Sequence, residues 1–591
     1  MSRKVITGGD VREDLPGGAA HLLRRRDDGL DVSGSDSEKL PAAPILHVAI
    51  LYLIAIIPRL LAIAFPPARF VYNPDELDLL RSALDRFIGI PTVVPMEPST
   101  VPQILHLPVV IADFLFHAGL PHTSADFLGR FSQYLAATYM DPRHSLALMR
   151  VTVAVLSSAG PVLAYLVARR LSRSAVMGWA CAILLSFNPV FFRQSVMAAG
   201  DAIAVMFVLA SATALLLDSP RVGFSGAFLG CAVASKYVVA PLVILPLVVI
   251  GLTSGREGLS RVAKFVGSAA LAFFLLVPWI WVDAIRSAKS LYGSVNKLGS
   301  TFDAAAFWSL FRSANGPEIV CVLFAVPGLV WGLRRIRHPD RRAWLVAAGT
   351  AMTLVTLLIA RHATTAFPRY YLSQWPPVIV VISAISWPMR ERRRIAFAAA
   401  LGIIALASIG DVARREAAER KPDPLIQALA EVPRLPATAE VHLPDEVLNT
   451  FRYAFPRSYY ERAADRGATL AVRGAGTTEF LKLHGIGNMS AAILRPAFNE
   501  DEQADAAHYA AIASIAPARA PDAFVYYDEA TENSIFAVRN AGIDETLTHA
   551  LETAANRAVA ILVPHAEPRL GSPLWQNGQW YWYVTRGDKL K

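Results

Sequence analysis

Cysteine and charged residues are both scarce in this sequence. Only three cysteines occur among its 591 residues, and all of them, Cys181, Cys231 and Cys321, fall inside apolar segments. This placement excludes a disulfide framework and the paired spacing of a zinc-binding motif. Charged residues make up only 18% of the chain, hydrophobic residues make up 54%, and the mean hydropathy is +0.38. The composition therefore excludes a soluble globular protein of this length and is typical of a polytopic membrane protein.

The formal net charge is +9, which in a soluble protein would suggest a nucleic-acid partner. In a membrane protein, however, Lys and Arg gather in the cytoplasmic loops, because charge in those loops sets the orientation of the helices. We therefore expect membrane lipids around this chain and no nucleic acid.

The first 42 residues have a different composition from the rest. They are rich in Gly, Asp, Ser and Arg and show no apolar periodicity, which predicts a disordered tail. Three consecutive arginines at 24–26 shortly precede the first apolar segment, so the tail is expected to be cytoplasmic. No cleaved signal peptide is expected, because the apolar run begins far from the start and no evident small-residue cleavage site follows it.

Apolar segments recur through residues 43–410 and predict about eleven membrane crossings. With a cytoplasmic start, the densest Lys and Arg clusters all fall on one side, as the positive-inside rule requires. The map gives a long first external loop over 67–145 and a C-terminal part outside the cytoplasm. The expected crossings are 43–66, 146–168, 175–192, 201–217, 223–235, 238–252, 265–282, 317–333, 344–360, 372–388 and 395–409.

Residues 411–591 lose the long apolar runs and regain charge, which indicates a soluble α/β domain outside the cytoplasm. Aromatic residues gather near its end, and we favour core or membrane-interface packing for them over carbohydrate stacking. This aromatic group comprises Trp575, Trp580, Tyr581, Trp582 and Tyr583. Helices are expected over 423–432 and 545–558, and strands over 439–443, 469–472, 523–527, 534–538 and 560–563. The predicted fold class is thus an α-helical polytopic membrane protein with a C-terminal soluble α/β domain.

A pair of carboxylates, Asp75 and Glu76, follows directly on the first apolar segment. Two interpretations are open. Asn73 is a natural N-cap and Pro74 suits the first helical position, so both acids would lie in a first turn that favours negative charge. The same geometry would also hold a carboxylate rigidly at the membrane face, beside a substrate.

Other polar side chains are expected at the same external face. Asp201 can cap its helix, and Arg369, next to Tyr370, can extend to the interface. Lys236, next to Tyr237, is harder to explain structurally, because it interrupts an apolar stretch that otherwise carries no charge. Ionisable residues in such places are costly and usually functional. Two acids and two bases at one membrane face suggest chemistry on a lipid-borne anionic substrate, with Lys236 and Arg369 holding a phosphate.

Within the first loop, residues 103–120 form another apolar stretch, which we interpret as an interfacial helix, with a re-entrant segment as the alternative. Asp113 and His117 are four residues apart and can share a helix face. Without a third ligand, such a pair is more often a hydrogen-bonded packing pair than a metal site. No metal site is therefore predicted, although paired acids can also bind a divalent cation, and that use stays open.

Several short motifs, taken in order, resemble a known group of enzymes. The chain is similar to the membrane glycosyltransferases of the C superfamily, namely the bacterial relatives of protein O-mannosyltransferases and of the lipid A aminoarabinose transferase. The resemblance covers roughly residues 43–410, and the family often has an aromatic residue soon after the acidic pair, where this chain has leucines and Asp78. The matching pieces are NPDE at 73–76, MAAGDA at 197–202, GAFLG at 226–230, SKY at 235–237 and FPRYYL at 367–372, before Trp375 and Pro376.

The resemblance implies an enzyme that takes a sugar from a polyprenyl-phosphate carrier at the outer face of the inner membrane and passes it to a protein, lipid or glycan acceptor. It places the general base at Asp75, with Glu76 as its neighbour, and Asp201 as a second acid. Lys236 and Arg369, with the adjoining Tyr237 and Tyr370, would contact the carrier phosphate. Direct displacement with inversion at the anomeric carbon fits these roles.

Two other classes of function remain open. A transporter or flippase of lipid-linked sugars could also use buried charges, but it predicts repeated or broken helices, and no clear internal repeat is found. A non-catalytic scaffold has no need of Lys236 inside an apolar run. The transferase interpretation is therefore favoured, without identifying the sugar or the acceptor.

Overall fold

The computed structural model describes most of the helical part of the chain and parts of the C-terminal domain. It covers, with a few single gaps, residues 44–66, 100–123, 142–253, 257–277, 345–353, 372–435, 440–443, 523–525, 535–538, 543–554 and 558–585, together with scattered positions between 76 and 138 and at 447. The predicted tail over 1–42, the predicted crossing over 317–333 and the predicted strand over 469–472 lie outside these residues.

Apolar helices dominate the described residues, and they make the chain a multi-pass membrane protein, as its composition predicts. Five helical stretches are long and apolar enough to cross a bilayer, or six if one bent pair forms a single span. They include α2 (Ile45–Ala64), α13 (Gly258–Leu276) and α20 (Glu391–Glu419), the last of which extends well beyond the predicted crossing. Shorter apolar helices pack between them, namely α10 (Asp201–Leu215), α11 (Val222–Ser235), η1 (Tyr237–Val243) with α12 (Ile244–Thr253), and α19 (Trp375–Ser386).

Two predicted crossings prove to be less regular than the sequence indicates. The segment predicted over 146–168 consists of α6 (Arg143–Ser157) and α7 (Ala159–Ser172). The segment predicted over 175–192 bends by 61° between α8 (Ala175–Ser186) and α9 (Pro189–Val196). Asn188 caps α9 by accepting a hydrogen bond from the backbone of Phe191 at 2.8 Å. Buried Arg59 of α2 donates to the carbonyl of Ser186 at 3.0 Å, so it satisfies the end of α8 at the bend.

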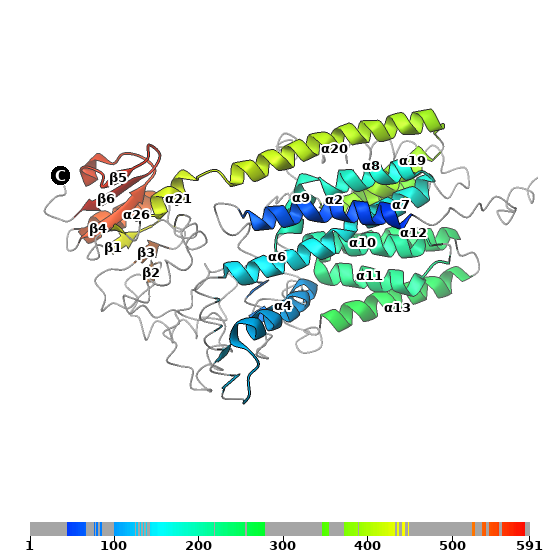
Figure 1. Ribbon diagram of the computed structural model, residues 1–591, viewed down its shortest axis with the longest axis horizontal. Coiled ribbons are helices and arrows are strands. Elements are labelled where there is room, and N and C mark those ends of the chain that lie inside the picture. The colour runs from blue at the N-terminus through cyan, green and yellow to red at the C-terminus, as the bar shows by residue number, and fades with distance from the viewer. Residues whose placement is uncertain are drawn as a thin grey trace, which may run out of the picture. The chain divides into compact units, whose positions relative to one another are not determined.

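Close packing of α11 against α13 explains the glycines at 226 and 230. A Cβ atom at Gly226 would lie 2.2 Å from the carbonyl oxygen of Phe265, and one at Gly230 would lie 2.3 Å from that of Ala269. Small residues four apart let two membrane helices approach until their backbones touch. The motif over 226–230 therefore positions α11, and Figure 1 shows the two helices side by side.

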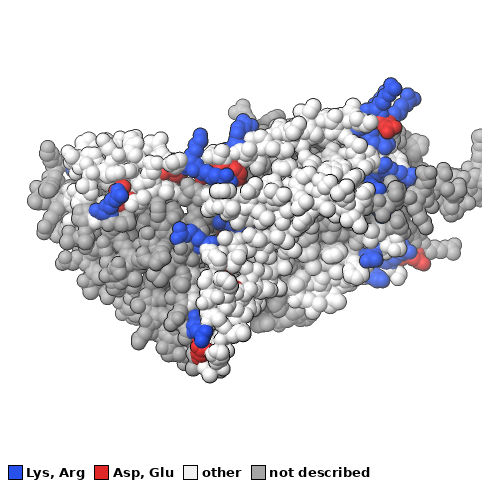
Figure 2. Space-filling model, viewed as in Figure 1, with Lys and Arg blue, Asp and Glu red and all other residues white. Residues whose placement is uncertain are grey.

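Basic residues mark one end of the helical bundle. There Arg170 donates to the carbonyl of Leu216 at 2.9 Å, Arg173 lies over the ring of Trp387, and Arg394 donates to the carbonyl of Ser386. Figure 2 shows Lys and Arg dense at this end, where α7, α12 and the start of α20 meet in Figure 1. The clustering is that predicted by the positive-inside rule. The basic residues at the end of α7 and at or near the starts of α11, α13 and α20 are Arg169, Arg170, Arg173, Arg221, Arg261, Lys264, Arg390, Arg392, Arg393 and Arg394.

Helix α4 (Thr100–Ala118) lies in the half of the bundle away from the basic end. Near its start, Pro102 touches the position of Gly200, where α10 begins, and near its end Asp113 accepts a hydrogen bond from Ser145 at the start of α6. Both contacts are remote from the basic end. The stretch is helical as expected, but α4 also has the length and composition of a span, so its predicted place at the membrane interface stays a prediction.

The C-terminal residues form a six-stranded sheet in the order β2-β3-β1-β4-β6-β5. The central strand β1 pairs in parallel with β3 and β4, and the remaining pairs are antiparallel. The predicted helices and strands over the described residues are confirmed, with ends that shift by a few residues. The elements are α21 (Pro424–Leu429), β1 (Glu440–His442), β2 (Ala523–Val525), β3 (Ile535–Val538), α26 (Ile543–Ala554), β4 (Val559–Val563), η7 (Pro568–Leu570), β5 (Trp575–Gln576) and β6 (Tyr581–Thr585).

The aromatic group ends in strand β6, which the sequence analysis did not predict. Trp582 and Tyr583 are both buried, so packing is the right interpretation for these two residues. Because neighbouring side chains in a strand point to opposite faces, Tyr583 joins the core beneath α26, whereas the Trp582 indole donates to the carbonyl of Ala428 in α21 at 2.6 Å.

Candidate active site

A buried ion pair anchors the loop that follows α2 to the helical bundle. Glu76 is fully buried and accepts two hydrogen bonds from the Arg150 guanidinium of α6, at 2.9 Å from Nε and 2.8 Å from Nη2. The described apolar residues that follow, Leu79, Leu80, Ala83 and Leu84, are also buried. With Glu76, they have the spacing of one face of a helix. A buried charge needs a partner of this quality, because an uncompensated charge in the interior is strongly destabilising.

The same carboxylate holds the chain segment that leads into α10. Glu76 Oε1 accepts a hydrogen bond from the backbone N–H of Ala198 at 2.8 Å. Two residues later, Gly200 lies so close to its neighbours that a Cβ atom there would be 2.6 Å from Pro102 Cγ and 2.9 Å from the carbonyl oxygen of Ser235. The motif over 197–202 therefore has a glycine because three chain segments converge at this point.

Asp201 and Lys236 meet directly beyond this convergence. Asp201 opens α10, where the helix dipole favours a carboxylate. Lys236 ends α11 in an extended conformation before η1 begins at Tyr237, so it lies at a break in the apolar run. The Lys236 Nζ is 3.9 Å from Asp201 Oδ1, and the two side chains are 15% and 7% exposed. This separation exceeds that of a hydrogen bond and leaves a charged contact that retains access to solvent.

Helix α4 adds polar side chains beside the same segment. His106 is fully buried and lies against the backbone of Ala198, and Gln103 is buried one turn before it. His106 lies in the stretch predicted as an interfacial helix, residues 103–120, and was not predicted as a site residue. Its proximity to Ala198 brings it into the shell that surrounds Glu76.

The structure therefore brings together three of the residues predicted for the site. Glu76, Asp201 and Lys236 surround residues 197–200 at the end of the bundle opposite the basic cluster, and Tyr237 follows Lys236 in η1. The predicted base Asp75 and the predicted phosphate contacts Arg369 and Tyr370 lie outside the described residues. Their roles remain predictions.

Arg150 is the main residue that the sequence analysis missed. It is a charge within a predicted membrane crossing, which is the signal that drew attention to Lys236. Arg150 lies near the expected start of its segment, where an arginine commonly extends to the interface. For this reason its ion pair with Glu76 was not predicted.

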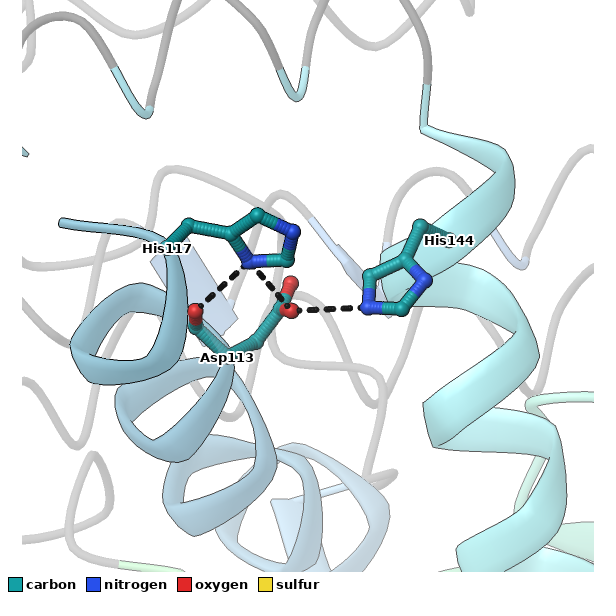
Figure 3. Close-up of side chains that lie close together, drawn as sticks. All are labelled: Asp113, His117 and His144. Carbon is teal, nitrogen blue, oxygen red and sulfur yellow. Dashed lines mark hydrogen bonds and ion pairs between the residues drawn. The ribbon is translucent and has the colours of Figure 1, made fainter.

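The described residues also contain a group with metal-ligand geometry, at the far end of α4. Asp113, His117 and His144 each offer one ligand atom, and these atoms lie within 4.8 Å of one another (Figure 3). The sequence offered no third ligand beside Asp113 and His117, and the structure places His144, at the start of α6, next to them.

Comparison with known proteins supports the resemblance drawn from the motifs. No curated protein sequence matches the chain. Among solved structures, the fold is similar to that in "Crystal Structure of ArnT from Cupriavidus metallidurans bound to Undecaprenyl phosphate", with 11% identity and a TM-score of 0.41, over 91% of this chain and 97% of that one. Residues 136–281 match the profile of the family described as dolichyl-phosphate-mannose-protein mannosyltransferase. Over these residues, the predicted resemblance to membrane glycosyltransferases is confirmed.

Proposed function

We propose that this protein transfers a sugar from a polyprenyl-phosphate carrier to an acceptor at the membrane face that holds Glu76, Asp201 and Lys236. The family that matches residues 136–281 is described by a dolichyl-phosphate-linked mannose, which is a sugar on a polyprenyl phosphate. That stretch contains Arg150, Asp201 and Lys236. The family match and three charged groups of the site thus lie in the same stretch of the chain, residues 136–281.

The observation that carries the proposal is the anchoring of Glu76. Its hydrogen bonds to Arg150 and to the backbone of Ala198 fix a first-loop residue beside the start of α10, although 122 positions separate Glu76 from Ala198 in the sequence. A binding surface or scaffold has no need of this arrangement. A transferase needs it, because acid, base and phosphate contacts must come from distant segments and be held in a fixed geometry.

In this proposal, Asp75 is the general base and Glu76 is the residue that positions it. Asp75 directly precedes Glu76 in the chain, so the buried anchor restricts where its carboxylate can lie. Asp75 would accept the proton of the attacking acceptor group while that group displaces the carrier phosphate with inversion at the anomeric carbon. The phosphate is a good leaving group and needs no general acid.

Lys236 and Arg369 would stabilise the negative charge that develops on the leaving phosphate. Arg369 lies three residues before Leu372, which is buried just ahead of α19. Because α19 ends at the basic cluster, we expect its start, and therefore Arg369, at the same end of the bundle as Lys236. Tyr237 and Tyr370 would add hydroxyl groups beside the two cations, and Asp201 would orient Lys236.

The proposed orientation follows from the basic end of the bundle. If that end is cytoplasmic, the site faces the outside of a bacterial inner membrane, and residues 411–591 form an extracytoplasmic domain. The acceptor, whether protein, lipid or glycan, would then approach from that side.

The proposal is tested by transfer of a labelled sugar from membrane polyprenyl-phosphate carriers, with the acceptor identified by mass spectrometry and protein levels matched. We expect Asp75→Asn to lower transfer by about 10²- to 10⁴-fold, the usual contribution of a general base. Arg261→Gln, a change to an exposed ion pair on α13 at the basic end of the bundle, is the control for protein level. Unchanged transfer in Asp75→Asn would contradict the role of the base. If no product depends on the protein, but lipid-linked sugar accumulates on one membrane face, the protein is a transporter.

A further inference from the structure

A second cluster of polar side chains lies where the end of α4 meets the start of α6, apart from the residues assigned to sugar transfer. His117 Nδ1 and His144 Nε2 each lie 3.1 Å from the same oxygen, Asp113 Oδ1. Figure 3 shows both imidazoles directed at this carboxylate, one from its own helix and one from α6. The Asp113 side chain is 2% exposed, whereas those of His117 and His144 are 48% and 58% exposed. The cluster is thus a buried anion beneath two imidazoles that reach solvent.

The two oxygens of the Asp113 carboxylate are held differently. Oδ2 accepts hydrogen bonds from the hydroxyls of Tyr134 at 2.8 Å and Ser145 at 2.7 Å. Oδ1 is buried and has no hydrogen-bond partner among the described residues, although two imidazole nitrogens lie near it. Outer partners that fix one oxygen and direct the other at a ligand are typical of metal-binding carboxylates.

The distances within the cluster fit one small cation. Zinc binds imidazole nitrogen and carboxylate oxygen at about 2.0–2.2 Å in a tetrahedron, so neighbouring ligand atoms lie about 3.3 Å apart. The two observed separations of 3.1 Å from Asp113 Oδ1 are close to that value. His117 Nδ1 also lies 2.9 Å from the Asp113 carbonyl oxygen. Because its ring is half exposed, it can exchange that hydrogen bond for a metal bond with a small rotation.

We propose that Asp113, His117 and His144 bind a divalent transition-metal ion, of which Zn²⁺ is the best match. Two imidazoles and one carboxylate favour Zn²⁺ over Mg²⁺ or Ca²⁺, which take mainly oxygen ligands. The exposure of both imidazoles leaves the fourth position to water. The ion joins the end of α4 to the start of α6, so it positions the helix that carries Pro102 and His106 against the helix that carries Arg150.

The test is binding of Zn²⁺ alone to the full-length chain purified in detergent and stripped with a chelator, measured by equilibrium dialysis and elemental analysis. We expect one tightly bound ion per chain. Tyr134→Phe removes an outer partner of Asp113 and should weaken Zn²⁺ binding by roughly 10- to 100-fold. His144→Ala and His117→Ala each remove a proposed ligand and should weaken Zn²⁺ binding by more than that. His122→Ala, a change at another exposed histidine of the same loop, should bind as the wild type does.

A second measurement keeps the result independent of small folding defects. Zn²⁺ should raise the thermal unfolding temperature of the wild type and of His122→Ala but not that of His144→Ala, because an ion stabilises only a chain that binds it. The proposal is overturned if the stripped protein binds no stoichiometric Zn²⁺. It is also overturned if all variants bind it equally, since the ion would then lie elsewhere.

Discussion

Two charged contacts lie at the same end of the helical bundle and differ in nearly every physical respect. Glu76 and Arg150 are both buried and share two hydrogen bonds of 2.8 and 2.9 Å. Asp201 and Lys236 are 3.9 Å apart, and the Lys236 side chain is 15% exposed. The first contact has the geometry that a buried charge requires. The second is a looser contact, and in the proposed function the first positions the site while the second takes part in its chemistry.

The difference between the two contacts predicts different roles for their acids, Glu76 and Asp201. A carboxylate that accepts three hydrogen bonds is held in one orientation, which suits Glu76 to fix the first loop. A carboxylate beside an accessible lysine can instead orient that lysine toward a phosphate. Variants of the two contacts should therefore fail in different ways.

The largest expected effect comes from Arg150→Ala, which would leave Glu76 buried without its partner. Loss of one member of a buried pair costs about 3–5 kcal/mol of folding free energy, so both stability and transfer should fall. The control is Arg193→Ala, which removes a more exposed pair with Glu419 and should cost about 1 kcal/mol or less. Chemical unfolding in mixed micelles measures both variants, and equal losses would refute the distinction between buried and exposed pairs.

The next effect in size tests the close approach of the helix that carries Lys236. Gly230→Val would force a side chain into the carbonyl oxygen of Ala269 and separate α11 from α13. Overpacking of this kind costs about 1–3 kcal/mol. Gly267→Val in α13 is the matched control, because nothing lies within 4 Å of its added Cβ. If Gly230→Val is as stable as Gly267→Val, the glycines of the 226–230 motif have some purpose other than packing.

A smaller effect is expected from Asp201→Asn, which removes the charge beside Lys236 but keeps the shape of the side chain. Stability should change by about 1 kcal/mol or less, the usual contribution of an acid in the first turn of a helix. Transfer should fall by about tenfold, which corresponds to about 1.4 kcal/mol. Initial rates at matched protein amounts measure this change, and a fall as large as that of Asp75→Asn would make Asp201 the base.

The smallest effect concerns an ion pair in the C-terminal domain between the exposed Arg569 and the buried Glu567. Hydrogen bonding from Arg569 lowers the pKa of Glu567, so the pair stabilises the folded domain above the unfolded pKa of the carboxyl and loses this effect as the pH falls through the folded value. Arg569→Ala should therefore lower the unfolding temperature slightly at pH about 7, and the difference should shrink below pH about 4. A difference that grows on acidification would have the wrong sign.

Much of the fold could be predicted because its signals are local. The segments of α10, α11 and α19 can be recognised by their apolar composition. Helix α26 can be recognised by its helical periodicity, and strand β4 by its short continuous apolar run. Strand β6 was missed because its aromatic residues were interpreted only as a packing cluster, although Trp and Tyr favour strands. The bend between α8 and α9 was missed because an apolar run looks the same whether it is straight or broken.

The site could be predicted only where one residue conflicts with its neighbours in the sequence. Lys236 interrupts an apolar run, and this interruption made it a predicted site residue. Arg150 and His144 act through partners that lie 74 and 31 positions away, and no local pattern reports such pairings. The role of Glu76 likewise depends on Arg150, so sequence reasoning could place it beside the base but could not distinguish an anchor from a catalytic acid.

The central claim is that Lys236 contributes chemistry and not stability, and the transfer rate of Lys236→Ala tests it most directly. At matched amounts of folded protein, the account predicts a rate lower by about 10²- to 10³-fold, as for loss of one group that stabilises transition-state charge. The unfolding temperature should stay close to that of the wild type, and Lys236→Arg should retain more activity than Lys236→Ala. A Lys236→Ala rate within about twofold of the wild type would contradict the claim, because no transition-state interaction would then have been lost.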